Sequence, residues 1–396
     1  MVEWSTTPPA NQGSAHESHA GHAHAGHPHH TGGSYGLTGV YSCDDCGRIS
    51  CSCRSGWYGG IYGVMMTRDD ENNRWLSFDS DFVTQHLLDS RDADMPWSYG
   101  GEVRLGRLFN CDRNAIEAVY WGIFPDQQEA NVLGAGLTGQ LNTTLSFNAL
   151  EYDNMAGGVP NPLPVTNYYD GVERHRLRRN YELYNIEVNL LQLPCIATPC
   201  GPCGPVGPRY RGTWFAGLRY LRFGENFNFA SDHTTNVFGD DVDEEMFYFI
   251  DVQNHLIGGQ IGGRGEWFFC NGRLSLFAGA KAGIFGNHMT HQHFIGGAAG
   301  AATVDLPGTP NDGVAIDIES NRDDLSFIGE LDLGMGYAIN HCWTFRAGYR
   351  VVGVSGIALS TNQIPNSFSD IEGVRNINSN GSLLLHGGYA GLELNY

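Results

Sequence analysis

The strongest constraint on the fold of this chain is a set of segments whose side chains alternate in polarity with a period of two. In the last of them, residues 382–396, the apolar residues Leu384 and Leu392 share one face, and Tyr389 and Glu393 share the other. Side chains of a β-strand point to opposite sides in turn, whereas an α-helix repeats every 3.6 residues. The same period recurs in residues 180–193, 255–269, 272–286, 325–339 and 343–357. These segments are therefore predicted to be strands with one apolar and one polar face.

The connections between the strands alternate between short and long. Short links occur at 110–114, 194–208, 270–272 and 340–342, and long links at about 69–98, 126–178, 231–243, 289–322 and 359–380. This alternation is typical of an up-and-down antiparallel transmembrane β-barrel with short periplasmic turns and long external loops. It predicts about ten strands, near 56–68, 99–109, 115–125, 180–193, 209–230, 244–270, 272–288, 323–339, 343–358 and 381–396. Residues 136–150 also alternate and would raise the count to twelve, but we expect them to form a hairpin within their long loop.

Composition supports an all-β chain and excludes membrane helices. Of 396 residues, 54 are glycine, 12% are aromatic and only 17% are charged, which suits strands and turns. A membrane helix needs roughly 18 apolar residues in a row, and no such run occurs. The mean hydropathy of −0.28 is compatible with a barrel, because alternating strands keep this value low. We expect a location in the outer membrane of a Gram-negative-type bacterium, with both termini periplasmic.

Three regions are predicted along the chain. Residues 1–40 are a disordered, His-rich arm, residues 41–55 a Cys-rich periplasmic lead-in, and residues 56–396 the barrel. No apolar segment follows Met1, so we infer that a signal peptide has been removed or left out of this numbering. Imidazole binds transition metals. The arm's candidate ligands for Zn²⁺ or Cu²⁺ are His22, His24, His27 and His29, with a solvated linker as the alternative.

Ten cysteines, an even number, fit an oxidising compartment. In the predicted topology all of them fall on the periplasmic side, where they are disulfide candidates. They are Cys43, Cys46, Cys51, Cys53, Cys111, Cys195, Cys200, Cys203, Cys270 and Cys342. The first four form a CxxC and a CxC pair, so a small zinc site stays open as an alternative for that cluster.

Negative charge is concentrated in the predicted long loops. With flanks to residues 178, 245 and 324, these loops carry 28 acidic and 7 basic residues, against a net charge of −20 for the whole chain. Carboxylates are hard oxygen ligands suited to Ca²⁺. The candidate calcium ligands are Asp240, Asp241, Asp243, Asp317, Glu319 and Asp323. The alternative is a solvated acidic surface that keeps the loops extended.

The polar faces of the predicted strands carry nearly balanced charge. The candidate ion-pairing residues are Glu102, Arg104, Glu117, Arg264, Glu266, Lys281, Glu330, Asp332, Arg346 and Arg350. In a barrel of eight to ten strands, inward side chains largely fill the interior. We therefore expect an occluded lumen packed by ion pairs. No nucleophile, base and orienting group converge in the sequence, so no enzymatic activity is expected.

Several segments carry a family resemblance. GLRYLRFGENF at 217–227, NHLIGGQIGGRGEW at 254–267 and GRLSLFAGAKAGIFGN at 272–287 resemble the planctomycete outer-membrane β-barrel porin family seven (BBP7-like). The resemblance implies an outer-membrane barrel and supplies no catalytic residues. The last eight residues, YAGLELNY, are similar to the terminal signal read by the barrel-assembly machinery. Gly391, Leu394 and Tyr396 occupy its expected positions.

These observations predict a structural or surface-assembly role exerted through long acidic loops. The expected partners are outer-membrane lipid, the barrel-assembly machinery, and neighbouring copies or a surface layer, with no nucleic acid. The alternative is a porin or metal-uptake channel for small solutes, supplied by the histidine arm.

Overall fold

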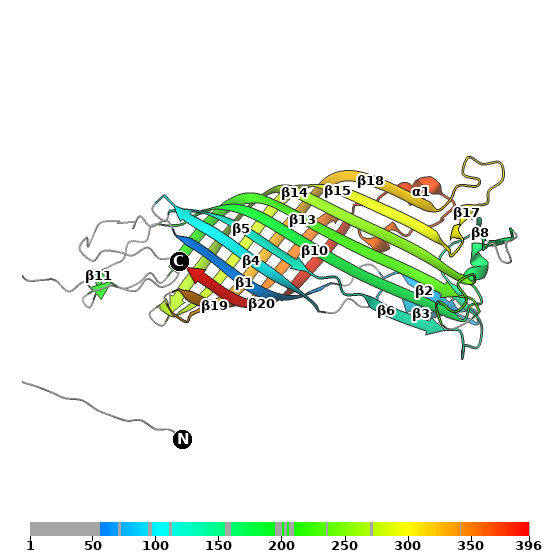
Figure 1. Cartoon of the computed structure of the whole chain (residues 1–396), viewed down its shortest axis with the longest axis horizontal. Coiled ribbons are helices and arrows are strands. Elements are labelled where there is room, and N and C mark those ends of the chain that lie inside the picture. Colours follow the sequence, from blue (N-terminus) through cyan, green and yellow to red (C-terminus); the bar gives the residue numbers. More distant parts are fainter. Residues whose placement is uncertain are drawn as a thin grey trace, which may run out of the picture. The chain divides into compact units, whose positions relative to one another are not determined.

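The computed structural model describes residues 56–69, 73–93, 97–110, 113–154, 160–194, 200–201, 204–205, 210–234, 237–269, 272–340 and 342–395. Its main feature is a closed ring of ten antiparallel strands, each paired with the next along the chain. They are β1 (Trp57–Arg68), β4 (Ser98–Phe109), β5 (Asn114–Ile123), β10 (Arg174–Gln192), β13 (Tyr210–Asp232), β14 (Glu245–Phe269), β15 (Leu274–Gly297), β18 (Asp317–Ala338), β19 (Trp343–Ile357) and β20 (Gly381–Asn395). Strand β20 pairs with β1 from Asn395 opposite Tyr58 to Leu385 opposite Arg68, which closes the ring. The predicted ten-stranded antiparallel barrel is confirmed (Figure 1).

The outer face of the ring carries the apolar belt that the alternation predicted. Leu218 on β13 is 71% exposed and Ile257 on β14 is 67% exposed, whereas Leu221 and Leu256, on the inner face of the same strands, are fully buried. Exposed apolar residues occur on all ten ring strands. An outward apolar band of this kind faces the hydrocarbon of the membrane. Among the described residues, no helix has the length and apolar character needed to cross a bilayer.

One side of the barrel is taller than the other. Strands β10, β13, β14, β15 and β18 continue well beyond the apolar belt, and β14 alone has 25 residues. The predicted loop 289–322 is wrong at both ends, because 289–297 belong to β15 and 317–322 to β18. Inward-facing Met289 and Ile318 explain the extension, since both are buried against folded loop segments.

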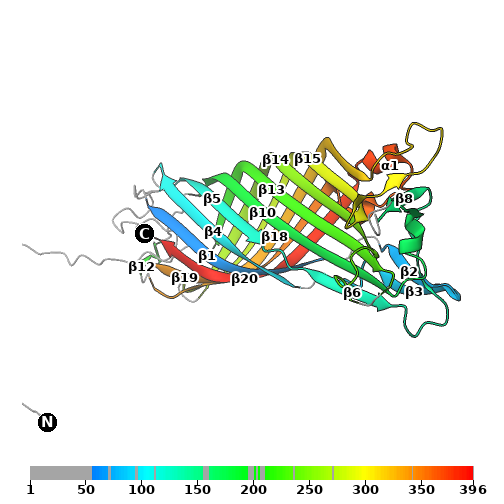
Figure 2. The same ribbon diagram turned by 45° about the vertical axis from the view of Figure 1, so that its right-hand side comes forward.

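The long connections fold into a compact unit, here called the cap, made of segments 73–93, 128–154, 160–172, 300–316 and 358–380. Its elements are β2 (Trp75–Asp79), β3 (Phe82–Asp89), β6 (Gln128–Leu133), β7 (Leu141–Thr143), β8 (Leu150–Asp153), β9 (Pro162–Pro164), η2 (Val165–Tyr168), β16 (Gly300–Ala301), β17 (Thr303–Val304), η4 (Ser360–Gln363) and α1 (Ile371–Arg375). Figures 1 and 2 both show β2, β3, β8 and α1 gathered at the end of the barrel opposite the short turns. The short strands β11 (Cys200–Gly201) and β12 (Gly204–Pro205) belong to the link between β10 and β13.

The hairpin expected within 136–150 is wrong. Strand β7 pairs with β2, and β8 pairs with β9 and β17. Apolar residues of this segment, Leu141, Phe147 and Leu150, are instead buried individually in the cap. Burial against separate partners has therefore replaced pairing within the segment.

The centre of the cap is a stack of aromatic rings from distant parts of the chain. Phe147 lies 4.3 Å from Tyr169 and 4.9 Å from Phe368, measured between ring centroids, and Tyr169 lies 5.4 Å from Phe229 of β13. All four side chains are fully buried. Stacked aromatic pairs add about 0.5–1.5 kcal/mol beyond their burial. The stack joins two connections, the one between β5 and β10 and the one between β19 and β20, to the extended wall of the barrel.

Candidate functional site: the lumen

An apolar layer lies across the lumen next to the cap. Nine of the ten ring strands contribute to it, and each member is at most 6% exposed. The layer comprises Tyr62, Val64, Met66, Val119, Trp121, Ile123, Tyr181, Leu183, Leu221, Phe223, Leu256, Phe277, Phe285, Ile328, Val352, Val354, Ile357, Leu359, Leu383, Leu385 and Tyr389. The sequence prediction expected ion pairs here and did not predict this layer. The apolar residues of the layer occupy the same alternate strand positions as the charged residues that face the lumen. This shared alternation is the sequence signal from which the layer could have been predicted.

A polar node joins the cap to the barrel. Glu225 of β13 is fully buried and contacts Arg179 of β10 at 2.5 Å and Arg68 of β1 at 3.3 Å. Its second carboxylate oxygen accepts a hydrogen bond from the backbone N–H of Ser360 at 2.9 Å. Asn254 supports the same segment, because it exchanges two hydrogen bonds of 2.8 Å with the backbone of Ala358. None of these residues was predicted from the sequence as part of a site.

A network of ion pairs occupies the lumen on the other side of the apolar layer. Arg350 of β19 contacts Glu102 of β4 at 2.6 Å and Glu330 of β18 at 3.3 Å. Lys281 of β15 contacts the same Glu330 at 2.9 Å. Glu102 also binds Arg104 at 2.5 Å. Asp332 lies 4.0 Å from Arg350, so the structure brings six of the predicted lumen residues into one connected network.

Two further residues complete this network. Glu187 of β10 and Arg219 of β13 are both almost fully buried. Arg219 contacts Glu330 at 3.0 Å and Glu187 at 3.7 Å, and Lys281 lies 3.2 Å from Glu187. Because Glu187 also accepts hydrogen bonds from Gln260 and Asn189, its charge is well compensated. Buried charges are tolerated when they are paired and hydrogen-bonded in this way.

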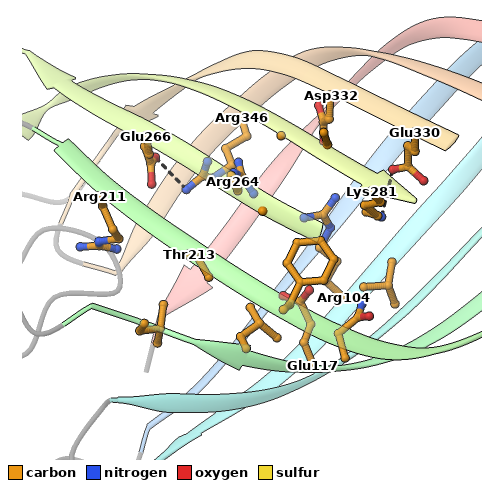
Figure 3. Close-up of a pocket in the computed structure, with 18 of the residues that line it drawn as sticks. Arg104, Glu117, Arg211, Thr213, Arg264, Glu266, Lys281, Glu330, Asp332 and Arg346 are labelled. Carbon is orange, nitrogen blue, oxygen red and sulfur yellow. Dashed lines mark hydrogen bonds and ion pairs between the residues drawn. The ribbon is translucent and has the colours of Figure 1, made fainter. Parts of the chain in front are cut away.

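The remaining predicted lumen residues lie nearer the short turns (Figure 3). Arg346 bridges Glu266 at 3.1 Å and Glu393 at 2.5 Å. The hydroxyl of Tyr389 donates to Asp332 at 2.7 Å, and that of Tyr58 donates to Glu117 at 3.1 Å.

Arg264 behaves differently from the other lumen bases. Among the described residues, no carboxylate oxygen lies within 4.0 Å of its guanidinium. The guanidinium carbon instead lies 4.0 Å from the ring centroid of Phe277.

Three buried histidines on the extended strands β10 and β15, beside the cap, are not paired with acids. His175 bonds to Ser77 and to the carbonyl of Tyr169, His291 to Ser320, and His293 to Tyr248. Burial lowers the pKa of His175 to about 3 and that of His291 to about 4. The pKa of His293 is also lowered, first by burial and then by His291. All three are therefore neutral at pH 7.

The predicted calcium ligands do not converge in the described part of the chain. Asp317 accepts a hydrogen bond from Gln292, Asp323 lies 2.7 Å from His288, and Asp241 accepts one from Thr234. The described residues contain no group of three or more His, Cys, Asp or Glu side chains arranged to hold a metal ion. Asp240, Asp243 and Glu319 are not part of such a group either. Calcium binding stays a prediction.

Other predicted residues are only partly covered by the structure. Cys342 is exposed and unbridged, and Cys200 lies in β11. The other eight cysteines and the histidines of the arm lie outside the described residues, as does Tyr396. Gly391 and Leu394 lie in β20, where they pair with β1 and β19. The disulfide, zinc and assembly-signal hypotheses stay predictions.

Residues 195–376 match the family model "Putative beta barrel porin-7 (BBP7)". The match includes the three segments 217–227, 254–267 and 272–287, so the predicted resemblance to BBP7 is confirmed over this part of the chain. The BBP7 match supports an outer-membrane location. No curated protein matches the sequence.

Three solved outer-membrane structures illustrate the structural likeness. The protease OmpT of Escherichia coli is similar over 86% of this chain and 96% of its own, at 12% identity and a TM-score of 0.41. A major outer membrane protein of Thermus thermophilus covers 86% of this chain and 99% of its own, at 8% identity and a TM-score of 0.32. The toluene transporter TodX of Pseudomonas putida covers 92% and 94%, at 9% identity and a TM-score of 0.26. At these values, the likenesses carry no conclusion about what this barrel does.

Proposed function

We propose that this protein is a closed, non-conducting outer-membrane barrel whose work is structural, with the folded cap providing contacts at the cell surface. The observation that carries the proposal is the apolar layer inside the lumen. Side chains from nine strands, all at most 6% exposed, meet there. A hydrated ion crossing such a layer would lose water without gaining a polar partner, which is costly. Diffusion through the lumen is therefore disfavoured.

The cap also supports a closed lumen, because it covers the end of the barrel next to the apolar layer. The segment that follows β19 turns back into the mouth, where Leu359 belongs to the apolar layer and Ile364 and Phe368 belong to the cap core. Contacts with the wall fix it, including those from Ser360 and Ala358 to the polar node described above. A freely opening channel would require this packed segment to move as a unit.

The surface of the cap suggests how contacts are made. The segments that build it carry 12 acidic residues against 3 basic ones. Their carboxylates favour partners with positive charge or bound divalent cations. Neighbouring copies or a surface layer linked through cations are therefore the proposed partners.

Single-channel recording in planar bilayers tests the closed lumen. The purified full chain is expected to give no stable open level. A variant with Trp121→Ser, Phe223→Ser and Phe285→Ser replaces three large members of the apolar layer and is expected to leak, which shows that the assay detects inserted barrels. A stable open level of several hundred picosiemens from the parent protein would overturn the proposal and favour the channel alternative.

A further inference from the structure

A cavity of about 110 Å³ lies between the ion-pair network and the short turns. This is room for several water molecules or a small ligand. All ten ring strands contribute to its lining. Lys281 and Glu330 of the network lie in its wall, as does Val119 of the apolar layer. The cavity is therefore separate from the cap and its contacts.

The charges that line the cavity do not all pair with one another. Five basic and five acidic side chains take part. Arg346 already holds two carboxylates, and Lys281 is bound within the network. Arg264 is the exception, because no carboxylate among the described residues reaches its guanidinium. Its Nε atom is buried without a hydrogen-bond acceptor, as is the Nη1 atom of Arg346.

The position of Arg264 leaves it ready to bind an anion. Phe277 packs against the guanidinium at 4.0 Å, and such cation–π stacking holds an arginine in place while its N–H edge stays available. Figure 3 shows the Arg264 guanidinium beside that of Arg346 within the cavity. A planar guanidinium matches a carboxylate with two parallel hydrogen bonds. Two buried donors without acceptors cost free energy unless a ligand or water satisfies them.

The surroundings restrict the ligand to one negative charge. Glu266 and Glu393 lie close to Arg346, so a doubly charged group such as phosphate would be repelled. Leu191, Leu193 and Phe215 line the same cavity and offer apolar surface to the rest of the ligand.

We infer that this cavity binds a small organic molecule with a single carboxylate, which Arg264 holds by its N–H edge while the apolar body packs against Phe215 and Leu191. The inference is independent of the proposed structural function, since it requires neither the cap nor a closed lumen.

Calorimetric titration of the purified full-length protein with benzoate tests the inference. Saturable binding at about one benzoate per chain is expected. Benzyl alcohol has the same ring without the charge and is expected to bind the parent protein at least tenfold more weakly. Arg264→Gln is expected to weaken benzoate binding at least tenfold. Arg264→Lys keeps the positive charge but loses the two parallel N–H donors of the guanidinium, and it is expected to weaken binding by a smaller factor.

Arg107→Gln is the matched control. Arg107 is also stacked on an aromatic ring, Trp57 at 5.4 Å, but lies on the outer face of β4 and does not line the cavity. It is expected to keep the parent affinity. Heat-dependent gel mobility reports whether each variant is folded; if Arg264→Gln does not fold, Arg264→Lys and the neutral probe decide. No saturable benzoate binding, equal binding of benzyl alcohol, or equal weakening by Arg107→Gln would overturn the inference.

Discussion

Replacing Arg350 by methionine should destabilise the barrel strongly, because this residue is the centre of the lumen network. Arg350 is 2% exposed and lies 2.6 Å from Glu102, 3.3 Å from Glu330 and 4.0 Å from Asp332. Its guanidinium also packs over the ring of Trp121 at 5.5 Å. Methionine keeps much of the volume and removes the charge. The change therefore tests the ion pairing rather than the packing.

The expected magnitude follows from what the substitution leaves behind. Removing one partner of a buried ion pair costs roughly 3–5 kcal/mol, because the other charge stays buried without compensation. Here Glu102 would keep Arg104, and Glu330 would keep Arg219 and Lys281. We therefore expect the lower end, about 3 kcal/mol, which is roughly a hundredfold change in the folding equilibrium.

The assay is equilibrium unfolding in urea of the full chain refolded into lipid vesicles, followed by tryptophan fluorescence and gel mobility. Arg107→Met is the matched control, because this arginine also stacks on a tryptophan but lies exposed on the outer face. Its loss should cost less than about 1 kcal/mol.

A double-mutant cycle separates pairing from other effects. Glu102→Gln combined with Arg350→Met should cost less than the sum of the two single changes, because the second change removes a charge that the first has left unpaired. If Arg350→Met is no more harmful than Arg107→Met, or if the two changes add, the network does not stabilise the barrel as argued.

Three further predictions concern the seam, the cap and the chain end. A Cβ atom at Gly391 would lie 2.0 Å from the Ile61 carbonyl oxygen, whereas the nearest neighbour of a Cβ atom at Gly388 would be 3.8 Å away. Gly391→Ala should therefore lower the folded fraction in refolding assays. Gly388→Ala should leave that fraction unchanged. His175 of β10 bonds to Ser77 and Tyr169 of the cap. Its pKa is about 3 in the folded protein and about 6.5 in an unfolded chain, so its contribution to stability is complete above pH 6.5 and is lost as the pH falls towards 3, by about 1.4 kcal/mol per pH unit. Limited proteolysis of the cap at pH 7.5 and 5 should show this acid sensitivity, and His175→Gln should reduce it; equal acid sensitivity in both proteins would contradict the assignment. Tyr396→Ser should reduce assembly in cells, and assembly equal to that of the parent would exclude the terminal-signal hypothesis.

The barrel was predictable because a strand repeats every two residues regardless of its partners. In β18, for example, exposed Leu331 and Leu333 alternate with inward Glu330 and Asp332, as the sequence predicted. The cap was not predictable in this way. Phe147, Tyr169 and Phe368 are far apart in sequence and follow no period, and only the folded chain brings their rings within contact. The lengths of β10, β15 and β18 depend on such contacts, which explains why β15 was predicted to end too early and β10 and β18 were predicted to begin too late.

Sequence indicated which charges face the lumen but not which of them meet. Arg264 and Arg346 each lie on an inner face beside acidic residues, yet Arg346 has two carboxylate partners and Arg264 has none among the described residues. Partner choice depends on how the strands are staggered around the ring, because side chains at the same height can come from strands that are not neighbours. Arg350 of β19 and Glu102 of β4 are such a pair, with β20 and β1 between them. A strand pattern alone does not contain this stagger.

The two ends of the lumen therefore differ in what they can do, and the difference makes the two proposals separable. At the cap end, apolar side chains and a packed segment fill the barrel. The proposed function at this end therefore depends on the outer surface of the cap. At the end with the short turns, a small charged cavity remains, with one arginine whose guanidinium no described carboxylate contacts. If the barrel conducts but benzoate binds through Arg264, the cavity is a site along a path. If the barrel does not conduct and benzoate binds, the cavity is a blind pocket. A ligand could then enter it only from the side of the membrane where the short turns lie.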